Sequence, residues 1–137
     1  MTGRVWKFIA AACFIPVLAG CGCSSAGCAS VVTVNNLNVT TLNSVGATAT
    51  LCADGVCDSS VLEKDTVGLM VPVNEGRSAG DVVDTTLRIV RGDTVLIDSR
   101  SPAVLTNVTP NGPRCAPVCT SVALEIRDGK LFPSAPE

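Results

Sequence analysis

The chain has 137 residues, with 10 Lys and Arg against 12 Asp and Glu, eight Cys, one Trp, no Tyr and no His. Without His it lacks the commonest general base near neutral pH, which excludes Ser-His-Asp and Cys-His catalysis. A net charge of −2 with 3% aromatic residues provides neither the basic surface nor the stacking platforms that nucleic acids require.

The first twenty residues have the organisation of a secretory signal peptide. Two basic residues lie within the first seven, and thirteen uncharged, mostly apolar residues follow over 8–20. That run is too short to span a bilayer, which takes about 20 apolar residues in a helix. We therefore expect residues 1–20 to be removed as a signal that ends in Leu18, Ala19 and Gly20.

The sequence Leu18-Ala19-Gly20-Cys21 resembles the lipobox of bacterial lipoproteins. In that family, lipid is attached to the cysteine sulfur before the signal is cut, and small residues before the cysteine admit the peptidase. The resemblance implies that Cys21 carries acyl chains such as palmitate, and two or three chains anchor a protein stably because each buried CH₂ contributes about 0.8 kcal/mol. We expect an exported protein, lipid-anchored through Cys21 on the extracytoplasmic side of the cell membrane, with residues 21–30 as a short tether.

Six cysteines remain if Cys13 leaves with the signal and Cys21 carries lipid. An even number of cysteines in an exported chain is typical of disulfides, and six allow 15 pairings. Their gaps of four, four and three residues do not match the Cys-x-x-Cys of redox or zinc sites, so we expect neither metal nor cofactor. The middle couple encloses the turn sequence Asp54-Gly55. Local spacing favours the disulfides Cys23–Cys28, Cys52–Cys57 and Cys115–Cys119.

From residue 31 onward the sequence alternates between apolar and polar residues, as half-buried β-strands do. Val contributes 18 residues and Thr 12 from Cys21 to the end. Strand patterns occur, in chain order, over 31–34, 45–51, 67–73, 83–89, 95–97, 103–108 and 122–126. Residues 60–65 are the one candidate for a helical turn. Seven or eight short strands predict an all-β fold, a single immunoglobulin-like antiparallel β-sandwich over 31–132, with a flexible tail over 133–137.

The segment Thr109–Ile126 contains Pro110-Asn111-Gly112-Pro113 followed by Cys115 and Cys119. It is similar to a stretch in small uncharacterised actinobacterial lipoproteins, where it leads into a late strand of a sandwich domain. The resemblance implies the sandwich fold and a Cys115–Cys119 bridge, and it implies no activity.

Two patterns allow a functional interpretation beside a structural one. Arg91-Gly92-Asp93 is the tripeptide of integrin-binding loops, but it lies between two strand patterns and we interpret it as a hairpin turn. Four carboxylates could offer oxygen ligands to calcium: Asp54, Asp58, Glu63 and Asp65. Their spacing departs from that of the known calcium-binding loop. We therefore interpret them as solvated loop residues.

Catalysis finds little support in the sequence. Ser60 precedes Lys64 by four positions, where a Ser-x-x-Lys site needs three. We expect no enzymatic activity. The sequence instead predicts an interaction or structural module of the cell envelope, with an envelope protein as partner. The alternative is a carrier for a small ligand or metal, which requires a concave pocket; a solid core with an open flat face would favour the interaction module.

Overall fold

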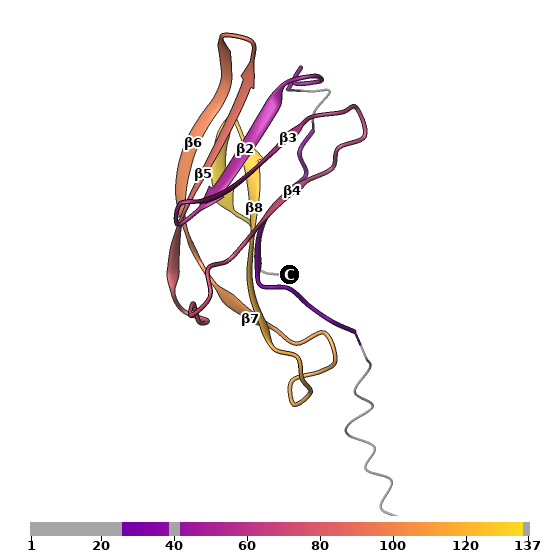
Figure 1. Ribbon diagram of the computed structural model, residues 1–137, viewed down its shortest axis with the longest axis vertical. Coiled ribbons are helices and arrows are strands. Elements are labelled where there is room, and N and C mark those ends of the chain that lie inside the picture. Colours follow the sequence, from indigo (N-terminus) through magenta and orange to yellow (C-terminus); the bar gives the residue numbers. More distant parts are fainter. Residues whose placement is uncertain (1–25, 39–41, 136–137) are drawn as a thin grey trace, which may run out of the picture.

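The computed structural model describes residues 26–38 and 42–135. Over these residues the chain forms nine β-strands and no helix, arranged in two sheets (Figure 1). The predicted all-β sandwich is confirmed, with one strand more than the upper expectation. In chain order the strands are β1 (Val31–Asn35), β2 (Thr48–Ala53), β3 (Val56–Val61), β4 (Leu69–Pro72), β5 (Val82–Arg91), β6 (Thr94–Val104), β7 (Thr106–Val108), β8 (Cys119–Arg127) and β9 (Lys130–Pro133).

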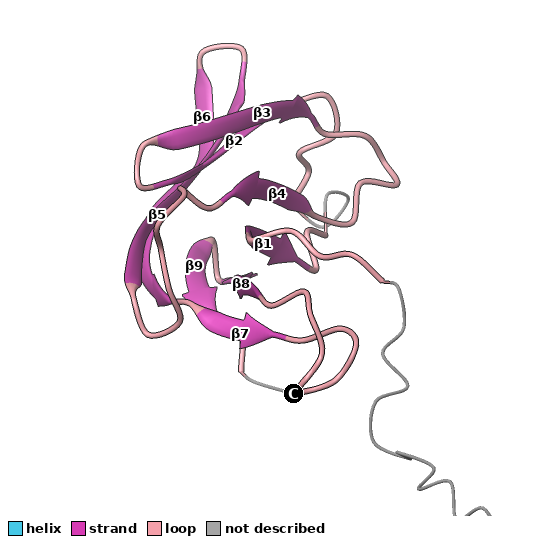
Figure 2. Cartoon of the chain, turned by 60° about the horizontal axis from the view of Figure 1, so that its bottom comes forward, coloured by secondary structure: helices cyan, strands magenta, loops and turns pink. Residues whose placement is uncertain are grey.

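The two sheets differ in their strand directions. The four-stranded sheet has the order β3-β2-β5-β6 and is antiparallel throughout. The five-stranded sheet has the order β4-β1-β8-β7, with β9 paired to the second half of β8 (Figure 2). In this sheet β1 runs parallel to β8 and antiparallel to β4. Immunoglobulin domains order their sheets ABED and CFG, so this chain shares the sandwich architecture but has a different connectivity.

Alternation along the strands places the core between the sheets. In β5, the residues Val83, Thr85, Leu87 and Ile89 are all buried, as their pattern predicts. Leu51 of β2 and Leu124 of β8 face the same core from opposite sheets. Every buried side-chain nitrogen or oxygen of the described residues has a hydrogen-bond partner. The buried polar side chains of the interior therefore have hydrogen-bond partners, as a stable sandwich requires.

One disulfide follows the sequence prediction. Cys52 and Cys57 lie opposite each other in the β2–β3 hairpin and are bonded. The turn between them, Asp54-Gly55, has φ values of +49° and +84°. Two successive positive φ values suit a two-residue hairpin turn, which Asp and Gly tolerate well.

The other two predicted pairings are wrong, because Cys28 is bonded to Cys119, 91 residues away in the sequence. This excludes both Cys23–Cys28 and Cys115–Cys119; Cys23 itself lies outside the described residues. Local spacing failed because the parallel pairing of β1 with β8 brings the residues before β1 beside the start of β8. The Thr120 N–H donates to Ser30 Oγ at 3.0 Å at this junction. Cys115 is also disulfide-bonded.

Strand β3 was not predicted from the sequence. Its inward positions lie opposite Leu51 and Ala49 of β2, yet they carry Asp58 and Ser60, both exposed. The core does not extend under this edge strand, so no apolar alternation marks it. Charged and polar inward positions also oppose pairing with a foreign strand. The expected helical turn at 60–65 is absent from the structure, since these residues end β3 and continue into a turn.

Candidate functional site

The predicted lipidation site lies outside the described part of the chain. Cys21 is the predicted lipid carrier, and the lipobox residues Leu18, Ala19 and Gly20 lie outside the described residues with it. Among the described residues, no helix is long and apolar enough to cross a membrane. The other candidate residues lie on the sandwich.

The four carboxylates considered for calcium do not come together. Asp54 lies in the β2–β3 turn and Asp58 in β3, whereas Glu63 and Asp65 belong to the loop that follows. In the described ranges, no group of three or more His, Cys, Asp and Glu side chains could hold a metal ion. Their common position near the second cysteine couple in the sequence therefore does not produce a shared site.

Asp54 instead connects three segments of the backbone. Its Oδ1 accepts the N–H of Asp84 at 2.9 Å, and its own N–H donates to the Asp84 carbonyl at 2.9 Å. Its Oδ2 accepts a hydrogen bond from Nη2 of Arg77, a residue of the loop between β4 and β5. The Asp54 side chain is 15% exposed. These contacts hold the β2–β3 turn, the β4–β5 loop and the start of β5 together.

Asp84 extends this cluster through a bidentate pair with Arg100 of β6. The Arg100 Nε donates to Asp84 Oδ1 at 2.6 Å, and Nη2 donates to Oδ2. The hydrogen bond to Asp84, and then its negative charge, raise the pKa of Arg100. Two arginines and two aspartates thus neutralise one another, and the cluster has a structural role rather than that of a charged binding site.

The Arg91-Gly92-Asp93 tripeptide closes the hairpin between β5 and β6. The Arg91 Nη2 donates to the carbonyl oxygen of Val45 at 3.1 Å and also to that of Asn43. Gly92 has a φ of +56°, which suits the turn. The guanidinium therefore fixes a neighbouring loop, in agreement with the interpretation of the tripeptide as a turn.

The middle of the outer face of the four-stranded sheet is polar and charged, whereas exposed valines, among them Val61 and Val82, lie toward its two ends. Arg88 of β5 and Asp98 of β6 form a cross-strand ion pair with 4.0 Å between Nε and Oδ2. On β2 and β3, the hydroxyls of Thr50 and Ser59 hydrogen-bond at 2.7 Å. Side chains here satisfy one another across the strands, as on a solvated sheet surface.

The outer face of the five-stranded sheet has a different chemistry over β4, β1 and β8. The register places Thr33 between Met70 and Ala123, and one step away it places Val31 between Pro72 and Ser121. Met70 is 62% exposed, and the side chains beside it in the register are short. We call these six residues the uncharged outer face: Val31, Thr33, Met70, Pro72, Ser121 and Ala123.

Charge begins only at one end of this sheet. There Glu125 and Arg127 form an ion pair, with 2.8 Å between Oε1 and Nε. The Arg127 guanidinium also lies over the Phe132 ring, 4.7 Å from its centroid. The uncharged outer face is therefore bounded by a self-satisfied charged cluster and contains no ionisable side chain of its own.

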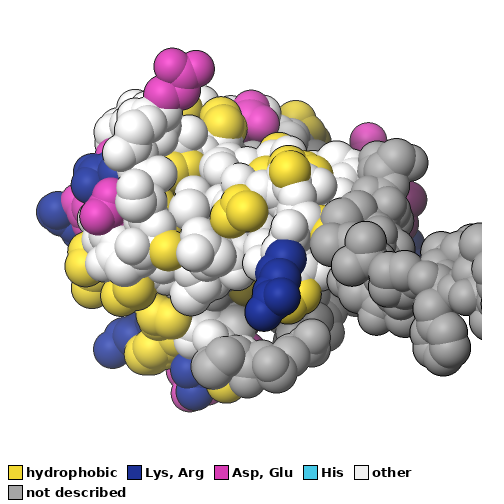
Figure 3. Space-filling model, turned by 90° about the horizontal axis from the view of Figure 1, so that it is seen from below, with side chains coloured by type: hydrophobic (Ala, Val, Ile, Leu, Met, Phe, Trp, Pro, Cys, Tyr) yellow, Lys and Arg dark blue, Asp and Glu magenta, His cyan; other side chains and the backbone are white. Residues whose placement is uncertain are grey.

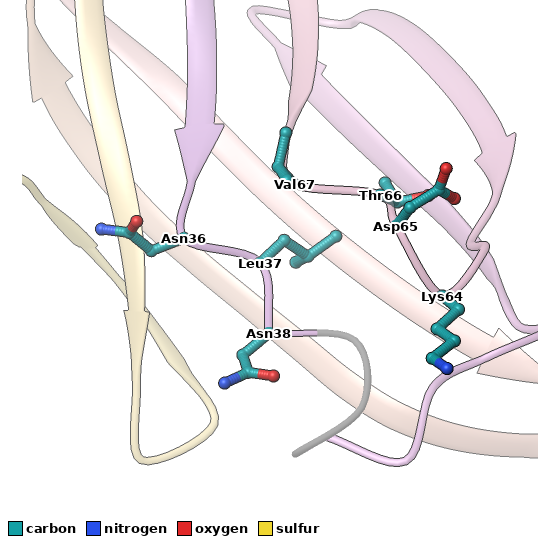
Figure 4. A pocket seen from close by; sticks show the side chains of 7 residues that line it. All are labelled: Asn36, Leu37, Asn38, Lys64, Asp65, Thr66 and Val67. Carbon is teal, nitrogen blue, oxygen red and sulfur yellow. The ribbon is translucent and has the colours of Figure 1, made fainter.

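A hollow of about 360 Å³ lies between residues 36–38, after β1, and residues 64–67, before β4 (Figure 4). Leu37 lines this hollow and points toward Thr66 and Val67, with 3% of its surface exposed. Its N–H donates to the Val67 carbonyl at 3.1 Å. Asn36 and Asn38 point to the opposite side (Figure 4). Because its polar groups diverge, the hollow lacks the convergent geometry of a ligand site.

Comparison of the chain with protein-family models, with curated proteins and with solved structures finds no match.

Proposed function

We propose that this protein is an exported bacterial lipoprotein that presents its β-sandwich on the cell envelope as an interaction module without catalytic activity. Cys21 is the residue that carries the lipid. The partner is another envelope protein, which docks on the uncharged outer face of the five-stranded sheet. The observation that carries the proposal is this uncharged face, on which Met70 is exposed.

The chemistry of the face supports a protein partner. The centres of protein interfaces are depleted of charge and enriched in residues such as Met, while their rims are polar. The uncharged outer face has this organisation, with Met70 projecting from β4 and the Glu125–Arg127 pair at its border. The opposite sheet face would require Arg88 and Asp98 to lose solvent without new partners, which is costly for charged groups.

The alternative is a tethered carrier for a small ligand or metal. It draws support from the hollow at 36–38 and 64–67, whose volume of about 360 Å³ falls within the range of small-molecule sites. The divergent asparagines and the buried Leu37 favour the interaction module over this alternative.

The lipid anchor is tested by Cys21→Ala. This variant should keep its signal and lose acylation, which intact-mass measurement of the membrane fraction detects directly. A variant that is still processed and still membrane-bound would contradict lipidation at Cys21.

The docking face is tested by photo-crosslinking in the native cell, with a photoreactive amino acid at Thr33. The matched control is Thr86, which is half-buried like Thr33 and faces outward from a central strand of the other sheet. We expect a defined crosslinked envelope protein from Thr33 and none from Thr86. Equal products from both positions, or none from Thr33, would show that the uncharged outer face is not the docking surface.

A further inference from the structure

The segment before β1 and the loop before β8 form one structural unit at the end of the molecule where the described chain begins (Figure 1). We call this unit, residues 26–30 and 109–118, the entry tip. The Cys28–Cys119 disulfide closes it. Asn111 Nδ2 donates to the carbonyl oxygens of Ala26 and Ala116, both at 2.9 Å. The two segments of the tip are therefore joined by a disulfide and by the Asn111 side-chain amide, which hydrogen-bonds to both of them.

The position of Cys28 fixes how far the entry tip can lie from a lipid on Cys21. Cys28 follows Cys21 by seven positions in the sequence. A fully extended chain covers at most about 3.6 Å per residue, so this connection spans no more than about 25 Å. An acylated Cys21 therefore keeps the entry tip, and not the far end of the sandwich, next to the membrane.

The surface of the entry tip suits contact with lipid headgroups. Between Asp98 and Glu125 the sequence contains no acidic residue. Arg114 is exposed, and no carboxylate of the described residues forms an ion pair with it. Val118 is 58% exposed. Four small or apolar residues of the tip are also exposed: Ala29, Pro110, Pro113 and Ala116.

The view from below shows this end of the molecule directly (Figure 3). Hydrophobic side chains are spread over the face, and acidic side chains lie mainly toward its rim. With the acidic side chains mainly toward the rim, a basic side chain on this face is available to the phosphates of an anionic bilayer.

We propose that the entry tip rests on the bilayer that holds the lipid of Cys21, with Arg114 against lipid phosphates and Val118 in the headgroup region. This inference rests on the proposed lipid anchor. It adds a second contact with the same membrane, and it sets the orientation of the domain, since the long axis of the sandwich then points away from the bilayer.

Tryptophan substitution provides a direct test, because the single Trp of the chain is Trp6, within the signal that maturation removes. Val118→Trp places a probe in the entry tip. Val61→Trp is the matched control, since Val61 is 60% exposed and lies in β3, outside the tip. The acylated mature products, from which the signal has been removed, are reconstituted into phosphatidylglycerol-containing vesicles. These vesicles contain a quencher-labelled lipid whose label lies near the headgroup.

We expect quenching of Val118→Trp to exceed that of Val61→Trp severalfold. Adding Arg114→Gln should lower the membrane-bound population of the tip about fivefold in anionic vesicles, the equivalent of one basic residue, and leave it unchanged in neutral vesicles. Equal quenching at the two positions in a protein shown by mass to be acylated overturns the tip contact and leaves the anchor intact. A product without acyl mass overturns the anchor and the tip contact together.

Discussion

Removal of the Cys28–Cys119 disulfide should destabilise the domain much more than removal of Cys52–Cys57. A disulfide restricts the unfolded chain, and its effect grows with the length of the loop that it closes. For the 91-residue separation of Cys28–Cys119 the loop-entropy relation gives about 4.6 kcal/mol. For the separation of 5 between Cys52 and Cys57 it gives about 2 kcal/mol. The two contributions therefore differ by about 2.6 kcal/mol.

The comparison requires two double variants, Cys28→Ser with Cys119→Ser and Cys52→Ser with Cys57→Ser. Both are made in a Cys115→Ser parent chain, because the disulfide of Cys115 would otherwise keep the long loop closed. Urea denaturation at 25 °C, followed by circular dichroism, measures the free energy of unfolding of each variant and of the parent chain. A thermal melt should show the same order, because each kcal/mol shifts the Tm of a domain this size by about 4–8 °C. The long-range variant should melt at least about 10 °C below the hairpin variant.

Two outcomes of the denaturation experiment would contradict this prediction. If both double variants lost the same free energy of unfolding, or if the hairpin variant lost more, the closing of the long loop would not be what stabilises the entry tip. Hydrogen exchange gives an independent reading at Thr120, whose N–H donates to Ser30 Oγ beside this disulfide. Protection of that amide should fall in the long-range variant and persist in the hairpin variant.

Three further substitutions have defined outcomes in the same denaturation assay. Leu51→Ala removes a fully buried core side chain and should cost about 2–5 kcal/mol. Asp54→Ala should lower the free energy of unfolding by about 1–3 kcal/mol, because it leaves the N–H of Asp84 at the start of β5 without its acceptor. Asp58 is exposed, and the control variant Asp58→Ala should change this free energy by at most about 0.5 kcal/mol. Gly68→Ala would place a Cβ 2.7 Å from a β1 carbonyl oxygen and should cost about 1–3 kcal/mol, while Gly27→Ala, with open space around it, should be nearly neutral.

The parts of the fold that depend on neighbours in the sequence were predictable. Val83 to Ile89 alternate because each inward side chain of β5 meets the core, and all four inward residues are buried. The turn at Asp54-Gly55 was recognisable because Asp and Gly tolerate the positive φ values that it adopts, and Asp128-Gly129 forms a second turn with positive φ values at both residues. The Cys52–Cys57 disulfide follows from the first of these turns, since the turn alone sets which residues of the hairpin lie opposite each other.

Features that depend on the order of the strands in the sheets could not be predicted from residues that are neighbours in the sequence. Three short couples of cysteines suggest three local bridges, and nothing in their spacing indicates that β1 runs parallel to β8 and brings Cys28 to Cys119. The same is true of Asp54, whose partner Arg77 is 23 positions away and reaches it only once the β4–β5 loop is in place.

The uncharged outer face arises in the same way. Met70, Thr33 and Ala123 come from three distant segments that each look like an ordinary half-buried strand in the sequence. They form one surface because the first strand of the fold enters between β4 and β8 rather than at an edge. That central position also places the chain entering β1 beside the start of β8, where the disulfide forms. The pairing of β1 with β8 is therefore the common cause of both the proposed docking face and the proposed membrane-facing tip.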